Sequence, residues 1–258
     1  METMVKVDGG EVWADDSGGP GLPLVLLHPG VGDSRIWDGA LPALTEQHRV
    51  LRYDARGFGR SPKPTVAYSQ LRDLGTVLDH FGVGRAVLVG SSMGGSTALA
   101  LALADPGRVA GLALFAPGAV GAVGLESPEV SAEIERLATA GDMDGLVALA
   151  QRVWGVLDTS PEGPAARALR SAIPAWFTTY AYDVKDAPTY DRLRELDVPC
   201  LLALCEQDQA EVIAVNEEMA ARIPGCRLVR LADCDHFPSL RRPDAVARLI
   251  LDVSGQVA

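Results

Sequence analysis

Six short apolar runs recur along the chain, and helical patterns separate several of them. The runs cover residues 22–28, 48–54, 85–91, 109–117, 199–208 and 226–236. Several are apolar throughout, which is typical of strands in a sheet that is covered on both faces. Residues 69–81, 95–105 and 211–223 are predicted helices. This alternation predicts the α/β class, with a mostly parallel sheet and right-handed crossovers.

Two segments depart from the alternation. Residues 5–18 carry the turn signal Gly9-Gly10 and predict an early antiparallel hairpin. Residues 118–197 contain no convincing strand and are far too long for an ordinary connection. We therefore predict a helical cap subdomain over 118–197, inserted into a core domain formed by 1–117 and 198–258.

The charge balance limits the partners of the chain. Its 23 Lys and Arg residues face 34 Asp and Glu residues, which gives a formal net charge of −11. Such a chain repels phosphate backbones and anionic lipids, so we expect neither a nucleic acid nor a membrane as partner. The first residues lack the apolar core of a signal peptide, and no apolar run reaches membrane-spanning length. We expect a cytoplasmic protein.

All four cysteines lie in the last quarter of the chain, at Cys200, Cys205, Cys226 and Cys234. We expect buried free thiols, because a large chain without a secretion signal does not depend on disulfides. The four histidines show no zinc-type pairing with these cysteines, so we expect no structural metal.

The segment 90–94, GSSMG, lies between a predicted strand and a predicted helix and fits the pattern G-x-S-x-G. That context is typical of a nucleophile elbow, where the residues two before and two after the nucleophile must be small. Ser92 meets this condition, whereas Ser91 has Val89 and Met93 at those positions. The alternative is a glycine-rich turn that only begins a helix.

A serine hydroxyl needs a base to accept its proton. His48 precedes a predicted strand and His80 ends a predicted helix, so both are expected on the surface. His236 follows the last predicted strand, where a loop can reach the carboxyl edge of the sheet. We predict His236 as the base.

The base in turn needs a carboxylate to orient it. Asp208 ends a predicted strand and gives the chain order Ser, Asp, His. Glu126 is the second candidate, and Glu206, Asp233 and Asp235 are further acids near the same positions.

An oxyanion hole needs two N–H donors. Met93 follows the candidate nucleophile and supplies one backbone N–H. The second is expected two residues after His28, at Gly30, because Pro29 has no N–H. Val31 is the near alternative.

Separated segments of the chain together resemble the α/β-hydrolase superfamily. They are LLHPGVGDSRIW (26–37), RYDARGFGRS (52–61), VGSSMGG (89–95) and CEQD with DCDHF (205–208 and 233–237). The region around 37–64 is most similar to small bacterial esterases and to the 3-oxoadipate enol-lactonase branch. The resemblance implies the α/β-hydrolase fold, with a mostly parallel eight-stranded sheet, helices on both faces and an inserted helical cap.

The resemblance also implies Ser92 as nucleophile, His236 as base and Asp208 as acid. Asp54 and Arg56 are expected to form structural hydrogen bonds. The chain departs from the family pattern at Pro29, where a glycine is usual, and at Cys205 and Cys234 beside the acid and the base.

The expected function is hydrolysis of a small-molecule carboxylic ester or lactone through an acyl-enzyme, without metal or organic cofactor. Alternatives on the same triad are a C–C bond hydrolase, a cofactor-free perhydrolase of the haloperoxidase type, and a ligand-sensing receptor. A monomer or homodimer is expected. Candidate substrate contacts are Val31, Trp37, Trp154, Trp176, Tyr180 and Phe237, with core packing as the alternative for the aromatic residues of the cap.

Overall fold

The computed structural model describes residues 1–125 and 127–257 and contains an eight-stranded sheet. The spatial order is β1-β2-β4-β3-β5-β6-β7-β8, and β2 is antiparallel to both of its neighbours. All the pairs from β4 to β8 are parallel, which confirms the predicted mostly parallel sheet. The strands are β1 (Glu2–Val7), β2 (Gly10–Asp16), β3 (Leu24–Leu27), β4 (Val50–Tyr53), β5 (Ala86–Ser91), β6 (Val109–Phe115), β7 (Cys200–Cys205) and β8 (Arg227–Leu231).

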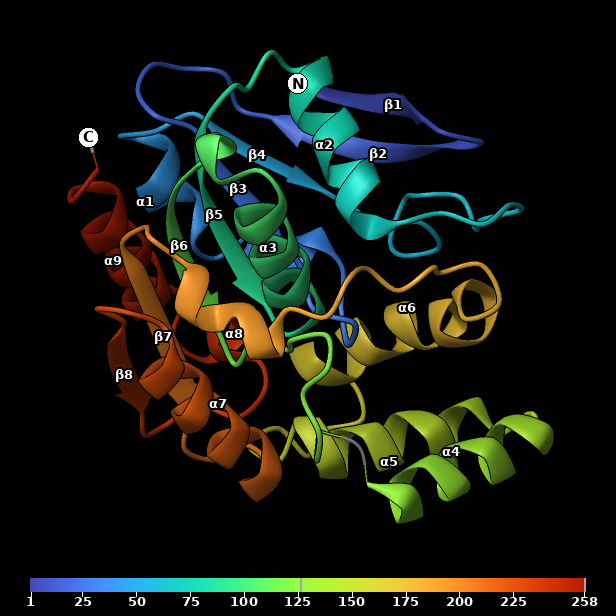
Figure 1. Ribbon diagram of the computed structural model, residues 1–258. Helices are drawn as coiled ribbons and strands as arrows, with labels where there is room; N and C mark the ends of the chain where they lie inside the picture. The colour runs from blue at the N-terminus through green and yellow to red at the C-terminus, as the bar shows by residue number, and fades with distance from the viewer. Residues whose placement is uncertain (126, 258) are drawn as a thin grey trace.

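Helices cover both faces of this sheet (Figure 1). They are α1 (Leu41–Thr45), α2 (Gln70–His80), α3 (Met93–Ala104), α4 (Pro128–Thr139), α5 (Met143–Trp154), α6 (Pro164–Thr179), α7 (Ala210–Arg222), α8 (Pro238–Arg241) and α9 (Pro243–Ser254). Short 3-10 helices are η1 (Ser34–Trp37), η2 (Pro106–Arg108) and η3 (Tyr190–Glu195). The predicted helices correspond to α2, α3 and α7. Among the described residues, none of these helices is both long enough and apolar enough to span a membrane.

The early hairpin is confirmed as β1 and β2, which pair antiparallel around Gly9. Gly9 has a φ of +68°, a conformation that glycine adopts without strain. The backbone conformation of the turn therefore explains why glycine stands at position 9.

The strands that are apolar at every position contribute side chains to two hydrophobic cores, one on each face of the sheet. Leu88 of β5 faces a core that includes residues of α2, α3 and α7, whereas its neighbours Val87 and Val89 face a second core with residues of α1 and α9. Because successive strand residues point to opposite faces, a strand covered on both sides must be apolar at every position. These two cores fix the carboxyl ends of the strands, where the candidate site lies.

Helices α4, α5 and α6 lie beyond the carboxyl ends of the parallel strands (Figure 1). They pack on one another through Leu146, Leu169 and Ile173, and the same cluster includes Val31 and Phe237 of the core segments. None of the described residues of 118–197 belongs to a named strand, although Asp183 forms an isolated bridge with Tyr68. We refer to α4–α6 as the helical insertion.

Two buried charged side chains, Asp54 and Arg56, hold the segment that follows β4. The carboxylate of Asp54 accepts hydrogen bonds from the backbone N–H groups of Ser34 at 2.9 Å and Arg60 at 2.8 Å. Arg56 pairs with Asp73 at 2.7 Å, and both side chains are almost fully buried. Asp54 and Arg56 are therefore structural, as predicted: Asp54 holds the segment after β3 through Ser34, and Arg56 joins the segment after β4 to α2.

Candidate active site

Ser92 lies at a sharp turn between β5 and α3. Its φ of +48° and ψ of −111° are strained for a residue with a side chain, and such strain is typical of functional turns. A Cβ atom on Gly90 would come within 2.6 Å of the carbonyl oxygen of Gly94, and a Cβ atom on Gly94 would overlap the carbonyl of Leu27. Only glycine fits at both positions, as the spacing predicts.

The side chain of Ser92 does not cap the helix that follows it. Ser92 begins α3, yet its side chain makes no capping hydrogen bond to the helix. Ser92 is half-buried and lines a cavity, whereas the neighbouring Ser91 is buried and its hydroxyl has no partner among the described residues.

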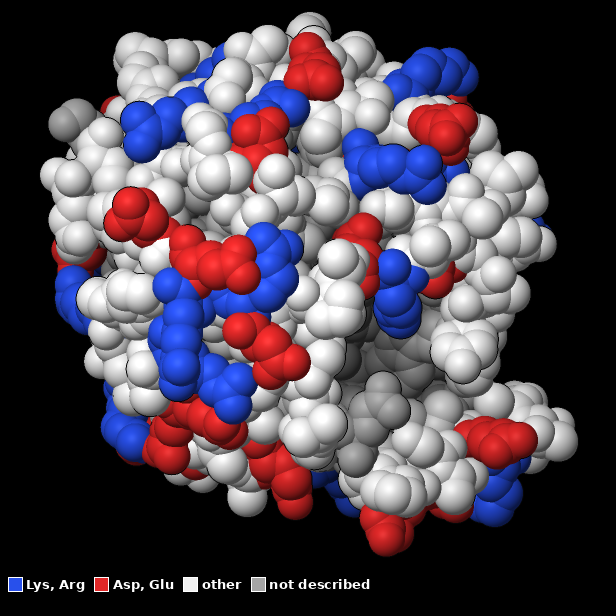
Figure 2. Space-filling model, viewed as in Figure 1, with Lys and Arg blue, Asp and Glu red and all other residues white. Residues whose placement is uncertain are grey.

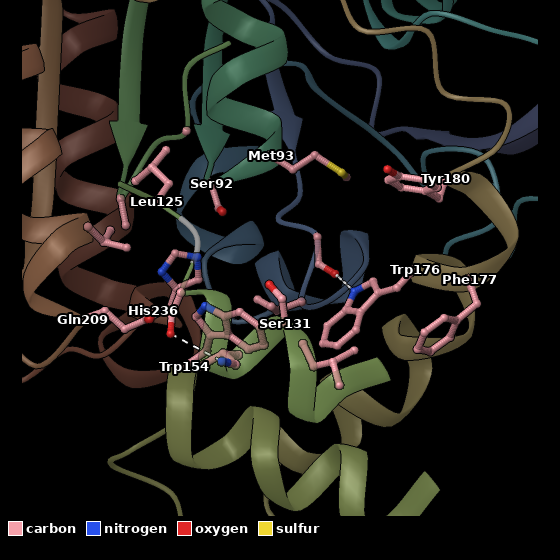
Figure 3. Close-up of a pocket in the computed structure, with 18 of the residues that line it drawn as sticks. Ser92, Met93, Leu125, Ser131, Trp154, Trp176, Phe177, Tyr180, Gln209 and His236 are labelled. Atoms are coloured by element: carbon pink, nitrogen blue, oxygen red, sulfur yellow. Dashed lines mark hydrogen bonds between the residues drawn. The ribbon is translucent and has the colours of Figure 1, made fainter. Parts of the chain in front are cut away.

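His236 lines the same cavity as Ser92 (Figure 3), and its Nδ1 lies 2.6 Å from Oδ2 of Asp208. The Asp208 carboxylate accepts a hydrogen bond from Nδ1–H, which leaves Nε2 as the unprotonated nitrogen of the neutral ring. The backbone N–H of His236 donates to the carbonyl of Trp154 at 3.1 Å. Burial of the imidazole lowers its pKa, but the charge and hydrogen bond of Asp208 outweigh burial and raise the pKa above the ordinary 6.5.

The competing acids have other partners. Asp233 pairs with Arg242 at 3.0 Å, and Glu206 is 3.9 Å from Arg230. The fully buried Asp235 pairs with Arg241 at 2.6 Å. Glu126 lies outside the described residues. Of the acids that the structure describes, Asp208 is the one hydrogen-bonded to the imidazole.

The loop after β3 presents the second candidate oxyanion donor. His28 Nε2 accepts the N–H of Ala55 at 3.0 Å, so its Nδ1 carries the proton and donates to the carbonyl of Pro29 at 2.8 Å. In a trans peptide the C=O and the following N–H point in opposite directions, so this bond also fixes the direction of the Gly30 N–H. Gly30 and Met93 both line the cavity beside Ser92. The proline that departs from the family pattern therefore takes part in positioning Gly30.

The main cavity has a volume of about 1000 Å³ and lies between the carboxyl edge of the sheet and the helical insertion. Figure 2 shows a hollow between the core and these helices, with acidic and basic residues along its upper rim. Four of the predicted substrate contacts line this cavity, namely Val31, Trp154, Trp176 and Tyr180.

Two predicted substrate contacts do not line the cavity, which corrects the sequence prediction. Trp37 is fully buried and packs edge-on against Phe115, with ring centroids 6.2 Å apart. Phe237 is also fully buried and belongs to the apolar cluster of the helical insertion. Trp37 belongs to the core cluster that includes residues of α1 and α9, and Phe237 to the cluster between the core and the helical insertion.

Other cavity residues were missed by sequence reasoning. Helix α4 contributes Val130, Ile134 and Ala138, which recur at intervals of four residues. This spacing is a signal for one face of a helix, but it cannot say what that face meets. Gln209 at the start of α7 and Phe177 of α6 also line the cavity.

A second cavity of about 710 Å³ shares Ser92 and Met93 with the main cavity. Its other side includes Asp183, Lys185 and Asp186. The ammonium of Lys185 lies 3.2 Å from Asp183. Ser92 is therefore accessible from two sides.

The structure places no group of three or more potential metal-ligating side chains together within residues 1–125 and 127–257. The four cysteines are free thiols, as predicted, although Cys226 is only half-buried. Burial raises the pKa of Cys234 to about 11, and this thiol lies in an apolar cluster with Cys205. Cys234 is therefore a core residue despite its position two residues before His236.

Comparison with solved structures identifies esterases and lactonases. The enol-lactonase from Burkholderia xenovorans LB400 is 27% identical with a TM-score of 0.83, and the match covers 97% of this chain and 99% of that one. Est816, an N-acyl homoserine lactone degrading enzyme, is 30% identical with a TM-score of 0.72, and the match covers 97% and 99% of the two chains.

Curated relatives include hydrolases of other bonds. A 2-hydroxy-6-oxononadienedioate/2-hydroxy-6-oxononatrienedioate hydrolase from Cupriavidus pinatubonensis is 27% identical over 95% of this chain and 90% of its own length. 2-Hydroxymuconate semialdehyde hydrolase from Pseudomonas sp. CF600 is 39% identical over 40% of this chain and 38% of its own length. The chain thus spans about a third of the length of several curated relatives that it matches.

The model of the alpha/beta hydrolase family matches residues 24–249, which include the strand, turn and loop segments that carry Ser92, Asp208 and His236. The eight-stranded sheet and the similarity to the enol-lactonase agree with this match. The chain therefore belongs to the alpha/beta hydrolase family.

Proposed function

We propose that the protein is a serine hydrolase that cleaves a carboxylic ester or lactone of a small molecule through an acyl-enzyme. The observation that carries the proposal is the 2.6 Å contact between His236 and Asp208 beside the uncapped, strained Ser92. The esterases and lactonases among the structural neighbours support the same reaction class. We also propose that residues 118–197 act as a cap over the site.

In the proposed first step, Ser92 Oγ attacks the carbonyl carbon and its proton passes to Nε2 of His236. Asp208 holds Nδ1–H and stabilises the imidazolium that forms. The N–H groups of Gly30 and Met93 stabilise the oxyanion, and each is expected to lower the barrier by about 3 kcal/mol. His236 then protonates the leaving alkoxide as the tetrahedral intermediate collapses.

In the second step, water gives a proton to His236 and attacks the acyl-enzyme. Collapse of the second intermediate returns the proton to Ser92 Oγ and releases the carboxylic acid. These steps use only groups of this chain and water, so we propose that activity persists in EDTA.

A hydrolase of carbon–carbon bonds is the second candidate. The relative from Cupriavidus pinatubonensis, aligned over 95% of this chain, favours it. Both candidates use the same nucleophile position, so substrate turnover must separate them.

A fluorophosphonate probe tests the nucleophile without any assumption about the substrate. It should label the wild type at a single serine, Ser92, identified by mass spectrometry of the digest. Ser91→Ala, which removes the adjacent hydroxyl, should be labelled as fast as the wild type, and Ser92→Ala should not be labelled. Labelling of Ser92→Ala at an equal rate would contradict the proposal.

A further inference from the structure

Among the described residues that line the main cavity, none is a lysine or an arginine. Of its described lining residues, the only one with a full charge besides the titratable His236 is Glu135 of α4. Glu135 makes no salt bridge to another described residue. The lining is otherwise formed by apolar and neutral polar residues, such as Val130, Ile134 and Trp176.

Two arginines near the cavity form salt bridges with carboxylates of the chain. Arg136, next to Glu135 on α4, pairs with Glu133 at 2.7 Å and does not line the cavity. Arg241, which follows His236 by five residues, pairs with the buried Asp235 at 2.6 Å. Neither guanidinium lines the main cavity.

The second cavity does not supply a free cation either. Lys185 is its only basic lining residue among those described, and Asp183 lies 3.2 Å from the ammonium. Asp186 lines the same cavity. The described lining of the second cavity therefore carries one positive and two negative side chains. In both cavities that reach Ser92, the described acidic side chains thus outnumber the described lysines and arginines.

From this distribution we infer that the substrate is an uncharged ester or lactone with an apolar acyl part, and that the site discriminates against acyl groups that carry a carboxylate. This inference rests on the proposed function and narrows its substrate class. Moving a carboxylate from water into an apolar cavity is costly unless a cation or several hydrogen bonds compensate. Glu135 is exposed where it lines the cavity, so it adds only solvent-screened repulsion, whereas an apolar acyl chain gains from burial against α4.

A preference for uncharged substrates would distinguish this chain from some of the proteins that it resembles. A 3-oxoadipate enol-lactone keeps one carboxylate, because the parent acid has two and the lactone consumes one. The name of the Cupriavidus pinatubonensis relative likewise describes a dicarboxylate as its substrate. We expect neither compound to be a good substrate of this chain.

A matched pair of esters tests the inference. 4-Nitrophenyl hexanoate and mono-4-nitrophenyl adipate have acyl chains of equal carbon number, and only the second ends in a carboxylate. Each kcat/KM is divided by the rate constant for hydrolysis of the same ester by hydroxide. The neutral ester should be favoured at least about tenfold at neutral pH. Equal values, or a preference for the adipate ester, would overturn the inference.

Two lysine variants identify the cause of the selectivity. Glu135→Lys places a cation at the cavity and should shift the ratio toward the adipate ester by about threefold or more. Glu46→Lys, just after α1, makes the same charge change at an exposed residue outside the cavity lining, and should leave the ratio unchanged. Equal shifts in the two variants would contradict a local effect.

Binding to Ser92→Ala separates failure of the inference from failure of the proposed function. If the wild type hydrolyses neither ester, the proposed function fails. The nitrophenyl group still quenches the fluorescence of Trp154 and Trp176, which line the cavity, so the dissociation constants of both esters can be measured. Tighter binding of the hexanoate supports the inference, and equal or tighter binding of the adipate ester overturns it.

Discussion

The indole N–H of Trp176 donates a hydrogen bond to the carbonyl oxygen of Gly30 at 2.7 Å (Figure 3). This bond joins α6 to the loop that carries a candidate oxyanion donor. Trp176 also packs edge-on against Trp154, with ring centroids 5.6 Å apart, and the Trp154 carbonyl accepts the N–H of His236. The two tryptophans of the helical insertion thus contact both the loop after β3 and the loop that carries His236.

Replacing Trp176 with Phe should lower kcat by about tenfold, because the Gly30 carbonyl loses its donor and the loop loses one restraint. Trp37→Phe is the matched control. It also removes an indole N–H, but one with no partner among the described residues. Its kcat should stay within about twofold of the wild type, although its melting temperature should fall. Equal losses of kcat in both variants, measured under saturating substrate, would contradict a positioning role for Trp176.

The pH profile of kcat/KM should fall on the acidic side with an apparent pKa above 6.5. Proton transfer from Ser92 requires neutral His236, and Asp208 raises the pKa of His236 despite burial, so activity is lost as the pH drops through that value. Asp208→Asn removes the carboxylate, so the acidic limb should move to lower pH while kcat falls by about 10³ to 10⁴. An unchanged acidic limb together with full activity would show that Asp208 is not the acid.

A methyl group at Gly94 should destabilise the fold. The added Cβ would overlap the carbonyl of Leu27, so Gly94→Ala should lower the free energy of unfolding by more than about 2 kcal/mol. Gly75, inside α2, has open space where a Cβ atom would lie, so Gly75→Ala should raise this free energy by about 0.5–1 kcal/mol. Urea unfolding measures both changes, and a Gly94→Ala protein as stable as wild type would disprove the packing argument.

The buried thiols should be slow to react in the native protein. Burial raises the pKa of Cys234 to about 11, so the thiol stays protonated at neutral pH. Cys200 and Cys205 are also buried, and Cys226 is half-buried. Titration with Ellman's reagent at neutral pH should detect Cys226 before the others, and all four thiols after unfolding. Rapid modification of Cys234 in the folded state would instead show that the loop before His236 opens.

The parts of the site that depend on local spacing could be predicted from the sequence. The two glycines around Ser92 are required by close contacts of the turn, and Gly30, the candidate donor chosen by its distance to His28 along the chain, lines the cavity. Asp208 and His236 end or follow neighbouring parallel strands, so the sheet brings them together.

The substrate side of the site could not be predicted in the same way. Which face of α4 meets the cavity depends on how the insertion packs, so the spacing of Val130, Ile134 and Ala138 marks one helix face without saying what that face meets. Trp37 and Phe237 lie close in sequence to site residues, yet both side chains point into the core. Proximity along the chain does not fix the direction of a side chain when a turn intervenes.

The most direct test of the account is steady-state hydrolysis of 4-nitrophenyl acetate, butyrate and octanoate by the wild type and by Ser92→Ala. We predict sustained turnover by the wild type, with kcat/KM increasing as the acyl chain fills the apolar cavity, and no turnover above background by a folded Ser92→Ala. Turnover that survives in Ser92→Ala, or a wild type that hydrolyses none of the three esters, would contradict the assignment of a serine esterase.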